Sequence, residues 1–155
     1  MSVILPKTVA RGGHKRGPLF YLAGPIRGAD DWQHQAYELL THKLGRDEFI
    51  AILPNRYDAE HPLWSQQLEG MSGVFSNQTE WERHYLAQCA WASVAGCVIF
   101  WLPVESRLNP RPKDEGPYAQ DTYGEIGEWR GHAAHLRNVR WVIGAEEGFP
   151  GLRTI

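Results

Sequence analysis

The stretch that decides the fold is LFYLAG, residues 19–24, a short apolar run that ends at a Gly-Pro pair. Such a run predicts a buried strand that delivers the chain into a loop. Residues 30–44 follow with apolar side chains near helical spacing and with Asp30 or Asp31 as the N-cap. FIAILP, residues 49–54, predicts a second buried strand. The three segments predict a strand-helix-strand unit, which is right-handed and parallel in nearly all folds.

The rest of the chain continues this alternation. A long loop, residues 55–77, leads into a helix at 78–92. CVIFWLP, residues 97–103, is continuously apolar, as a central parallel strand should be. A polar loop then precedes a helix at 123–136 and a last strand at 139–144. The order predicts an α/β fold: a three-layer α/β/α sandwich of the flavodoxin or Rossmann type, with a mainly parallel sheet of four or five strands.

Length and composition favour one domain. The chain has 155 residues, of which 43% are hydrophobic, enough for a single core. We assign residues 19–155 to this domain and residues 1–18, which hold basic residues and glycines, to a flexible leader. The closing GLRTI, residues 151–155, can add a short edge strand.

Charge and cysteine usage narrow the partners. The 16 basic and 18 acidic residues leave a net charge of −2, so we expect a small-molecule partner and neither nucleic acid nor a membrane. No span approaches the ~20 apolar residues of a membrane helix. Cys89 and Cys97 lie in apolar surroundings, which favours buried thiols in a reducing compartment, the cytoplasm.

Ligands of open parallel sheets bind beyond the carboxyl ends of the strands, where the strand order reverses. This rule gathers the loops after the strands, and the start of the last helix, onto one rim. We therefore expect Tyr21, Arg27, Trp101 and Glu125 to be neighbours.

The stretch QDTYGEIGEW, residues 120–129, opens the helix expected at 123–136, with Asp121 or Thr122 as its N-cap. Glu125 then lies in the first turn, where the helix dipole stabilises a carboxylate by ~0.3–1 kcal/mol and keeps it ionised. A charge that complements the helix end and a carboxylate nucleophile are about equally supported by these residues alone.

The glycines on either side of this acid bring the catalytic alternative level with the capping one, which the position in the helix alone would favour. Gly124 and Gly127 each cost helix stability of the order of 0.5–1 kcal/mol relative to alanine. We expect that something approaches this turn closely.

The loop YLAGPIRG, residues 21–28, matches neither a dinucleotide fingerprint nor a nucleoside-triphosphate loop. Its glycines and Arg27 suit a phosphate or a sugar, although a tight turn with a solvated arginine explains them equally well. His132 and His135 have no carboxylate or cysteine at metal spacing, so we expect no metal and no cofactor.

Four motifs in order carry a family resemblance: FYLAGPIRGADDWQ, QTEWERHYL, VIFWLP and YAQDTYGEIGEW. Together, over residues 20–144, they resemble the nucleoside 2-deoxyribosyltransferase superfamily. The resemblance implies retaining glycosyl transfer, in which Glu125 attacks the sugar C1′ and forms a glycosyl ester, with Tyr21 orienting Glu125. It also implies a homo-oligomer whose sites take residues from a neighbouring subunit.

A leaving nucleobase needs a proton donor. The candidates are, in falling order, Asp121, Glu82 and Glu80. The expected substrate-binding residues come from the first loop, the second helix, the third strand and the last helix: Gly24, Pro25, Ile26, Arg27, Trp81, Glu82, Trp101, Thr122 and Trp129, with Phe75 as a further stacking surface.

Two alternatives stay open. GPIRG is similar to the phosphate-holding loop of the superfamily's deoxynucleotide N-hydrolases, which favours hydrolysis of a nucleoside 5′-monophosphate with Arg27 on the phosphate. The other alternative is a catalytically idle domain of the same fold that senses a nucleotide or nucleoside.

Overall fold

A central parallel sheet organises the computed structural model, which describes residues 2–10, 17–91, 96–135 and 138–151. Within these residues the sheet has five strands in the order β1-β4-β3-β6-β7. Their bounds are β1 Val3–Ile4, β3 Leu19–Ala23, β4 Ile50–Ile52, β6 Gly96–Leu102 and β7 Trp141–Ala145. All of the pairs are parallel, which confirms the expected α/β class.

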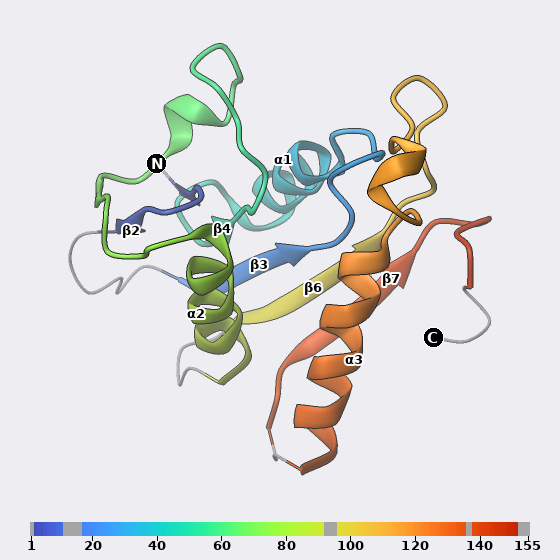
Figure 1. Cartoon of the computed structure of the whole chain (residues 1–155). Coiled ribbons are helices and arrows are strands. Elements are labelled where there is room, and N and C mark those ends of the chain that lie inside the picture. The colour runs from blue at the N-terminus through green and yellow to red at the C-terminus, as the bar shows by residue number, and fades with distance from the viewer. Residues whose placement is uncertain (1, 11–16, 92–95, 136–137, 152–155) are drawn as a thin grey trace.

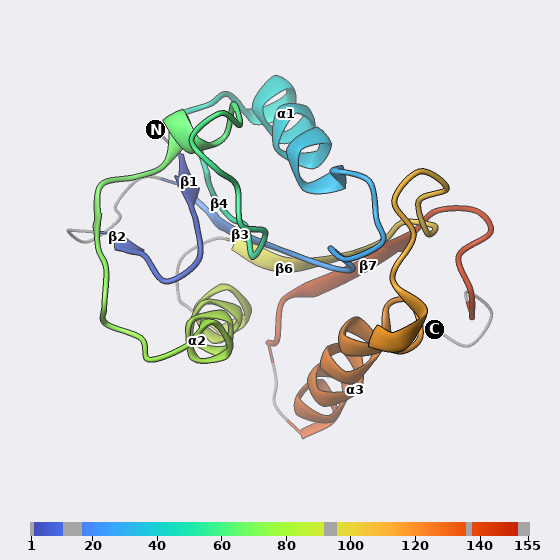
Figure 2. The ribbon, with the colours of Figure 1, turned by 45° about the horizontal axis from the view of Figure 1, so that its top comes forward.

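Helices cover both faces of this sheet (Figure 1). They are α1 Trp32–Leu44, α2 Gln78–Trp91 and α3 Gln120–His135, with short 3-10 turns η1 Trp64–Gln66 and η2 Lys113–Glu115. Figure 2 shows α1 on one side of the sheet and α2 and α3 on the other. This is the three-layer arrangement. The strand order reverses between β3 and β6, the two central strands.

Alternation along the central strands divides the core into two parts. Tyr21 of β3 and Phe100 of β6 pack with α2 and α3, whereas Leu22 and Trp101 pack with α1. Trp101 and Tyr21 therefore lie on opposite faces of the sheet. The expectation that Trp101 is a neighbour of Tyr21 and Glu125 is wrong, because the side-chain period of a strand is two.

The prediction of a flexible leader at residues 1–18 is wrong for the residues of this segment that the structure describes. Val3 is fully buried and lies in parallel register with Ala51, so β1 is an edge strand of the main sheet. Further along, β2 (Val9–Ala10) pairs with β5 (Gly70–Met71) in a second, antiparallel sheet. Two-residue strands carry too little periodicity to be detected in a sequence.

The last helix begins earlier than expected. Its first residue is Gln120, so Asp121 lies in the first turn and the N-cap predicted at Asp121 or Thr122 is wrong. Glu125 consequently lies in the second turn, where the influence of the helix dipole has faded. Of the tail strand expected at 151–155, all but the first residue lie outside the described part of the chain.

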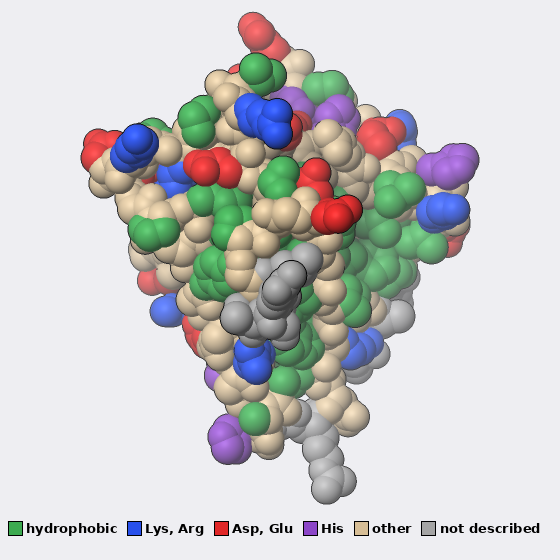
Figure 3. All heavy atoms as spheres, turned by 90° about the vertical axis from the view of Figure 1, so that its right-hand side faces the viewer, with side chains coloured by type: hydrophobic (Ala, Val, Ile, Leu, Met, Phe, Trp, Pro, Cys, Tyr) green, Lys and Arg blue, Asp and Glu red, His purple; other side chains and the backbone are tan. Residues whose placement is uncertain are grey.

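The surface carries both signs of charge. Figure 3 shows acidic and basic side chains interspersed over the upper part of one face, with hydrophobic side chains exposed between them. Val142 of β7 is one exposed hydrophobic residue of the sheet, with 53% of its surface accessible. No helix in the described ranges is long and apolar enough to span a bilayer.

Candidate active site between two helices

A pocket of about 310 Å³ opens between α2 and α3, on one face of the sheet. Helix α2 lines it with Thr79, Glu82, Arg83, Leu86, Ala87 and Trp91, and α3 lines it with Glu125, Glu128, Trp129 and His132. Three of the residues predicted for the site, Glu82, Glu125 and Trp129, therefore meet at one cavity although they come from two separate segments.

Glu125 is the most strongly perturbed acid of this pocket. Burial, above all, raises its pKa to about 8, and the negative charges of Glu82, Asp121 and Glu128 add to the effect. The expectation that the helix dipole keeps Glu125 ionised is wrong, because the second turn gives it little help and the neighbouring carboxylates oppose ionisation. The raised pKa favours the protonated form of Glu125 at neutral pH in the ligand-free protein.

Glu82 faces the same pocket from α2. Burial also raises its pKa, while a hydrogen bond of 2.7 Å from Gln78 Nε2 to its Oε1 lowers it in part. When two interacting carboxyl groups have unequal environments, one can hold a proton and act as an acid while the other is charged. The site thus contains two carboxyl groups whose pKa values burial raises, Glu125 to about 8 and Glu82 against the opposing effect of its hydrogen bond from Gln78.

Tyr21 lies beneath this pair at the centre of β3. It is fully buried, and its pKa is raised well above the usual value by burial first and then by the charges of Glu82 and Glu125. The negative charges of these carboxylates therefore disfavour ionisation of the Tyr21 hydroxyl. The role of Tyr21 in orienting Glu125 stays a prediction, and the charge of Glu125 contributes to the raised pKa of Tyr21.

The far end of the pocket is aromatic. The rings of Trp91 and Trp129 lie 5.0 Å apart between centroids, and His132 lies 5.3 Å from Trp129. Trp91 and His132 were not among the predicted site residues. The spacing of Trp129 and His132, three apart on one helix, is a usable signal, but nothing near Trp91 in the sequence pairs it with α3.

The other candidate proton donors are engaged elsewhere. Asp121 is exposed and lies 3.4 Å from Arg111 Nη1. Glu80 accepts a hydrogen bond of 3.1 Å from Ser76 N–H while Asn77 Oδ1 accepts one from Glu80 N–H, a reciprocal helix cap. Glu82, the second of the three in the sequence ranking, is the one that lines the pocket with Glu125.

The GPIRG loop has a structural explanation. Gly24 has φ +155°, and a Cβ there would lie 2.1 Å from the Trp101 carbonyl oxygen, so a side chain has no room. Pro25 O accepts a hydrogen bond of 2.7 Å from Trp32 Nε1. Ile26 lines a separate hollow of about 90 Å³ beside Trp32.

Arg27 points away from the pocket. Its side chain is 69% exposed and its Nη1 lies 2.7 Å from Glu115 Oε2. Arg83, by contrast, lines the pocket itself. Arg27 stands next to glycines in the sequence, but the loop turns its side chain outward.

Two further predicted residues are core residues. Trp81 is fully buried and its Nε1 donates a 2.9 Å hydrogen bond to Thr8 O, so it is not a stacking surface. Thr122 is buried in the first turn of α3. Trp101 lines a hollow of about 470 Å³ on the α1 side of the sheet, and Phe75 packs against the core beside His84.

The glycines of α3 do not mark a close approach within the protein. A Cβ placed on Gly124 or Gly127 meets no atom within 4 Å. The expectation that something approaches this turn closely is not met by any described part of the chain, so these positions are open to solvent or to a ligand.

One cluster was missed altogether. Asp31, His34 and His61 offer ligand atoms that all lie within 4.8 Å of one another, although the sequence indicated no metal site. Asp31, the N-cap of α1, and His34 in the first turn of that helix are three residues apart, a readable signal. His61 comes from a loop 30 residues away, which no spacing rule predicts.

No protein-family model matches this chain, and no curated protein matches it. The functional interpretation therefore rests on the residues of the site and on the motifs quoted above.

Proposed function

We propose that this chain catalyses N-glycosyl transfer on nucleosides, through a glycosyl ester on a glutamate, to another nucleobase or to water. The observation that carries the proposal is the pair Glu82 and Glu125, which face one pocket above the buried Tyr21. Enzymes of retaining glycosyl transfer usually use two carboxyl groups, one on either side of the glycosidic bond.

The pair suits the chemistry because burial raises the pKa of both carboxyl groups, which favours a state in which one holds a proton while the other is ionised. The active form has Glu125 ionised and Glu82 protonated, which requires the proton of the ligand-free Glu125 to pass to Glu82 when substrate binds. The developing positive charge on the sugar favours this redistribution, since it stabilises a carboxylate next to C1′.

In the first step a Glu125 carboxylate oxygen bonds to C1′ as the bond from C1′ to the base nitrogen breaks. The electron pair leaves with the base, which takes the proton of Glu82. In the second step a new base or water attacks C1′ and gives its proton to Glu82, while the ester electron pair returns to Glu125. Protons and charges balance over the cycle.

The aromatic end of the pocket provides a surface for the nucleobase. Trp91 is 42% exposed and packs against Trp129, so a flat ligand can stack on it. A second subunit, which the family resemblance implies, would close the open side of the pocket at Trp91. Light scattering on the purified chain measures that association.

A nucleoside 5′-monophosphate N-glycosidase is the second candidate. The specific observation in its favour is Arg83, a cation on the wall of the pocket that can pair with a phosphate. In this version water takes the place of the second base.

The test incubates the protein with deoxyadenosine and free cytosine, and separately with deoxynucleoside monophosphates, and follows base release by chromatography. Exchange that requires the acceptor base supports transfer, and base release from monophosphates alone supports the N-glycosidase. Glu125→Gln and Glu82→Gln should each abolish release, and Glu128→Gln, an exposed acid of the same pocket, should retain it. No release from either substrate class would refute the proposal.

Mass spectrometry of acid-quenched protein identifies the nucleophile directly. The sugar should be found on the peptide that contains Glu125. A sugar on Glu82 instead would make Glu82 the nucleophile and Glu125 the proton donor.

A further inference from the structure

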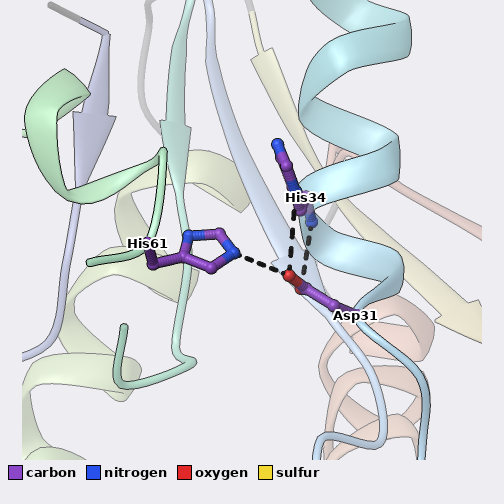
Figure 4. A group of neighbouring side chains, drawn as sticks. All are labelled: Asp31, His34 and His61. Carbon is purple, nitrogen blue, oxygen red and sulfur yellow. Dashed lines mark hydrogen bonds and ion pairs between the residues drawn. The ribbon is translucent and has the colours of Figure 1, made fainter. Parts of the chain in front are cut away.

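Three side chains from two distant segments converge beside the N-terminus of α1 (Figure 4). Asp31 precedes the helix, His34 lies in its first turn, and His61 comes from the loop between β4 and η1. His61 Nε2 lies 2.9 Å and His34 Nδ1 lies 3.8 Å from Asp31 Oδ2. We propose that Asp31, His34 and His61 bind a divalent transition-metal ion such as Zn²⁺.

The donor set fits this class of ion. Zn²⁺ binds imidazole nitrogen and carboxylate oxygen at about 2.0–2.2 Å, which places ligand atoms of a tetrahedral site roughly 3.4 Å apart. The observed separations of 2.9 Å and 3.8 Å lie on either side of that value. Small side-chain rotations therefore suffice, and the remaining coordination position is left for water.

An ion can reach the site. The side chains of Asp31, His34 and His61 are 37%, 31% and 21% exposed, so none is sealed in the core. The small hollow of about 90 Å³ that Asp31 and Asn55 line adjoins the cluster and has room for bound water.

Neighbouring groups hold the ligands in place. Tyr57 OH donates a 2.5 Å hydrogen bond to Asp31 Oδ1, and the backbone N–H of His34 donates to the same oxygen at 3.3 Å. The second carboxylate oxygen, Oδ2, is therefore the one that faces the histidines. Outer contacts of this kind orient first-sphere ligands in metal sites.

Both rings are also oriented. Tyr57 stacks on His61 with centroids 4.0 Å apart. His34 Nε2 lies 3.9 Å from Glu38 Oε1, so a small side-chain rotation would let it donate a hydrogen bond to this carboxylate, as in carboxylate-histidine-metal arrangements. His34 then presents Nδ1 to the ion.

Binding requires one local change. In the ligand-free protein the Leu63 N–H donates to His61 Nδ1 at 3.2 Å, so Nε2 carries the ring proton and donates it to Asp31. Coordination through Nε2 moves this proton to Nδ1, and the hydrogen bond from Leu63 is lost. The ion would then tie the loop around His61 to the start of α1.

The experiment is a calorimetric titration of the full, chelator-treated chain with Zn²⁺. We expect one ion per chain with a dissociation constant in the micromolar range or tighter. His34→Gln and His61→Gln should each weaken binding at least about tenfold, since loss even of an outer-shell partner costs 10–100-fold. His42→Gln, in the last turn of the same helix, is the matched control and should bind as the wild type does.

A Co²⁺ titration adds a spectroscopic measurement. The visible absorption of bound Co²⁺ should appear with the wild type and with His42→Gln and be lost with His61→Gln. Wild-type protein that shows no saturable Zn²⁺ binding would overturn the proposal without reference to any variant. Binding that survives in both His34→Gln and His61→Gln, or that falls equally in the control, would overturn it as well.

Discussion

The substitution Glu125→Gln should raise the stability of the protein by an amount that depends on pH. Glutamine has the shape of a protonated glutamate and carries no charge, so it occupies the buried position without holding a proton. Burial and the neighbouring acids raise the pKa of Glu125 from 4.5 to about 8 in the folded chain. The unfolded chain keeps the lower value.

The sign follows from linkage. An acid whose folded pKa is raised favours folding fully below its unfolded pKa and loses that contribution as pH rises towards its folded pKa. Between pH 4.5 and pH 7 the wild type should therefore lose roughly 3 kcal/mol through this one group, at about 1.4 kcal/mol per pH unit. Above pH 8 the loss levels off near roughly 5 kcal/mol. Glutamine has no such dependence.

Urea unfolding of both proteins at several pH values between 4.5 and 8.5 measures the effect. The difference in unfolding free energy should be small at pH 4.5 and reach about 3 kcal/mol in favour of the variant near pH 7. Glu128→Gln is the control, because this acid of the same helix is exposed and lies 3.7 Å from His132 at the surface. Its substitution should change stability by less than about 1 kcal/mol.

A difference between Glu125→Gln and wild type that is independent of pH would refute the reasoning. It would show that Glu125 is ionised throughout, which would return the residue to the charged state expected from the helix dipole.

Three other substitutions test the site. Tyr21→Phe keeps the buried ring but removes the hydroxyl near both carboxylates, so kcat/KM for base release should fall at least about tenfold with the fold intact; an unchanged value would make the hydroxyl dispensable. Gly127→Ala should raise the unfolding free energy by about 0.5–1 kcal/mol, because alanine favours a helix and its Cβ meets nothing within 4 Å. Thermal unfolding measures this effect, and a lower midpoint for the variant would contradict the prediction. Arg83→Ala should raise KM for monophosphates more than for nucleosides. Arg27→Ala removes a surface ion pair and should change KM little for either substrate. A larger effect of Arg27→Ala than of Arg83→Ala on monophosphates would show that the loop at Arg27 binds the phosphate.

The sheet was predictable because its central strands are continuous apolar runs. LFYLAG and CVIFWLP become β3 and β6, and Asp31 caps α1 as one of two expected residues. The fold class follows from these segments alone. The edge strand β1 was not predictable, since Val3 and Ile4 are too few to show a period.

The site was predictable in part. Glu82, Glu125 and Trp129, which were among the expected site residues, do meet in one pocket. The predicted ionised state of Glu125 failed, because its pKa depends first on burial and then on the charge of Glu82 from α2, and only the packed structure supplies both. The outward turn of Arg27 is likewise set by the loop that carries Glu115.

The edge strand β1 has a practical consequence for anyone who shortens this protein. Composition alone would suggest removing the first 18 residues. That deletion would take Val3 from its place beside Ala51 and bare the hydrogen-bonding edge of β4, whose three residues are buried. It would also remove Thr8, whose carbonyl accepts the hydrogen bond from the Trp81 indole. An uncovered parallel edge of this kind recruits other chains, so the shortened protein should be lost to aggregation before its activity can be assayed.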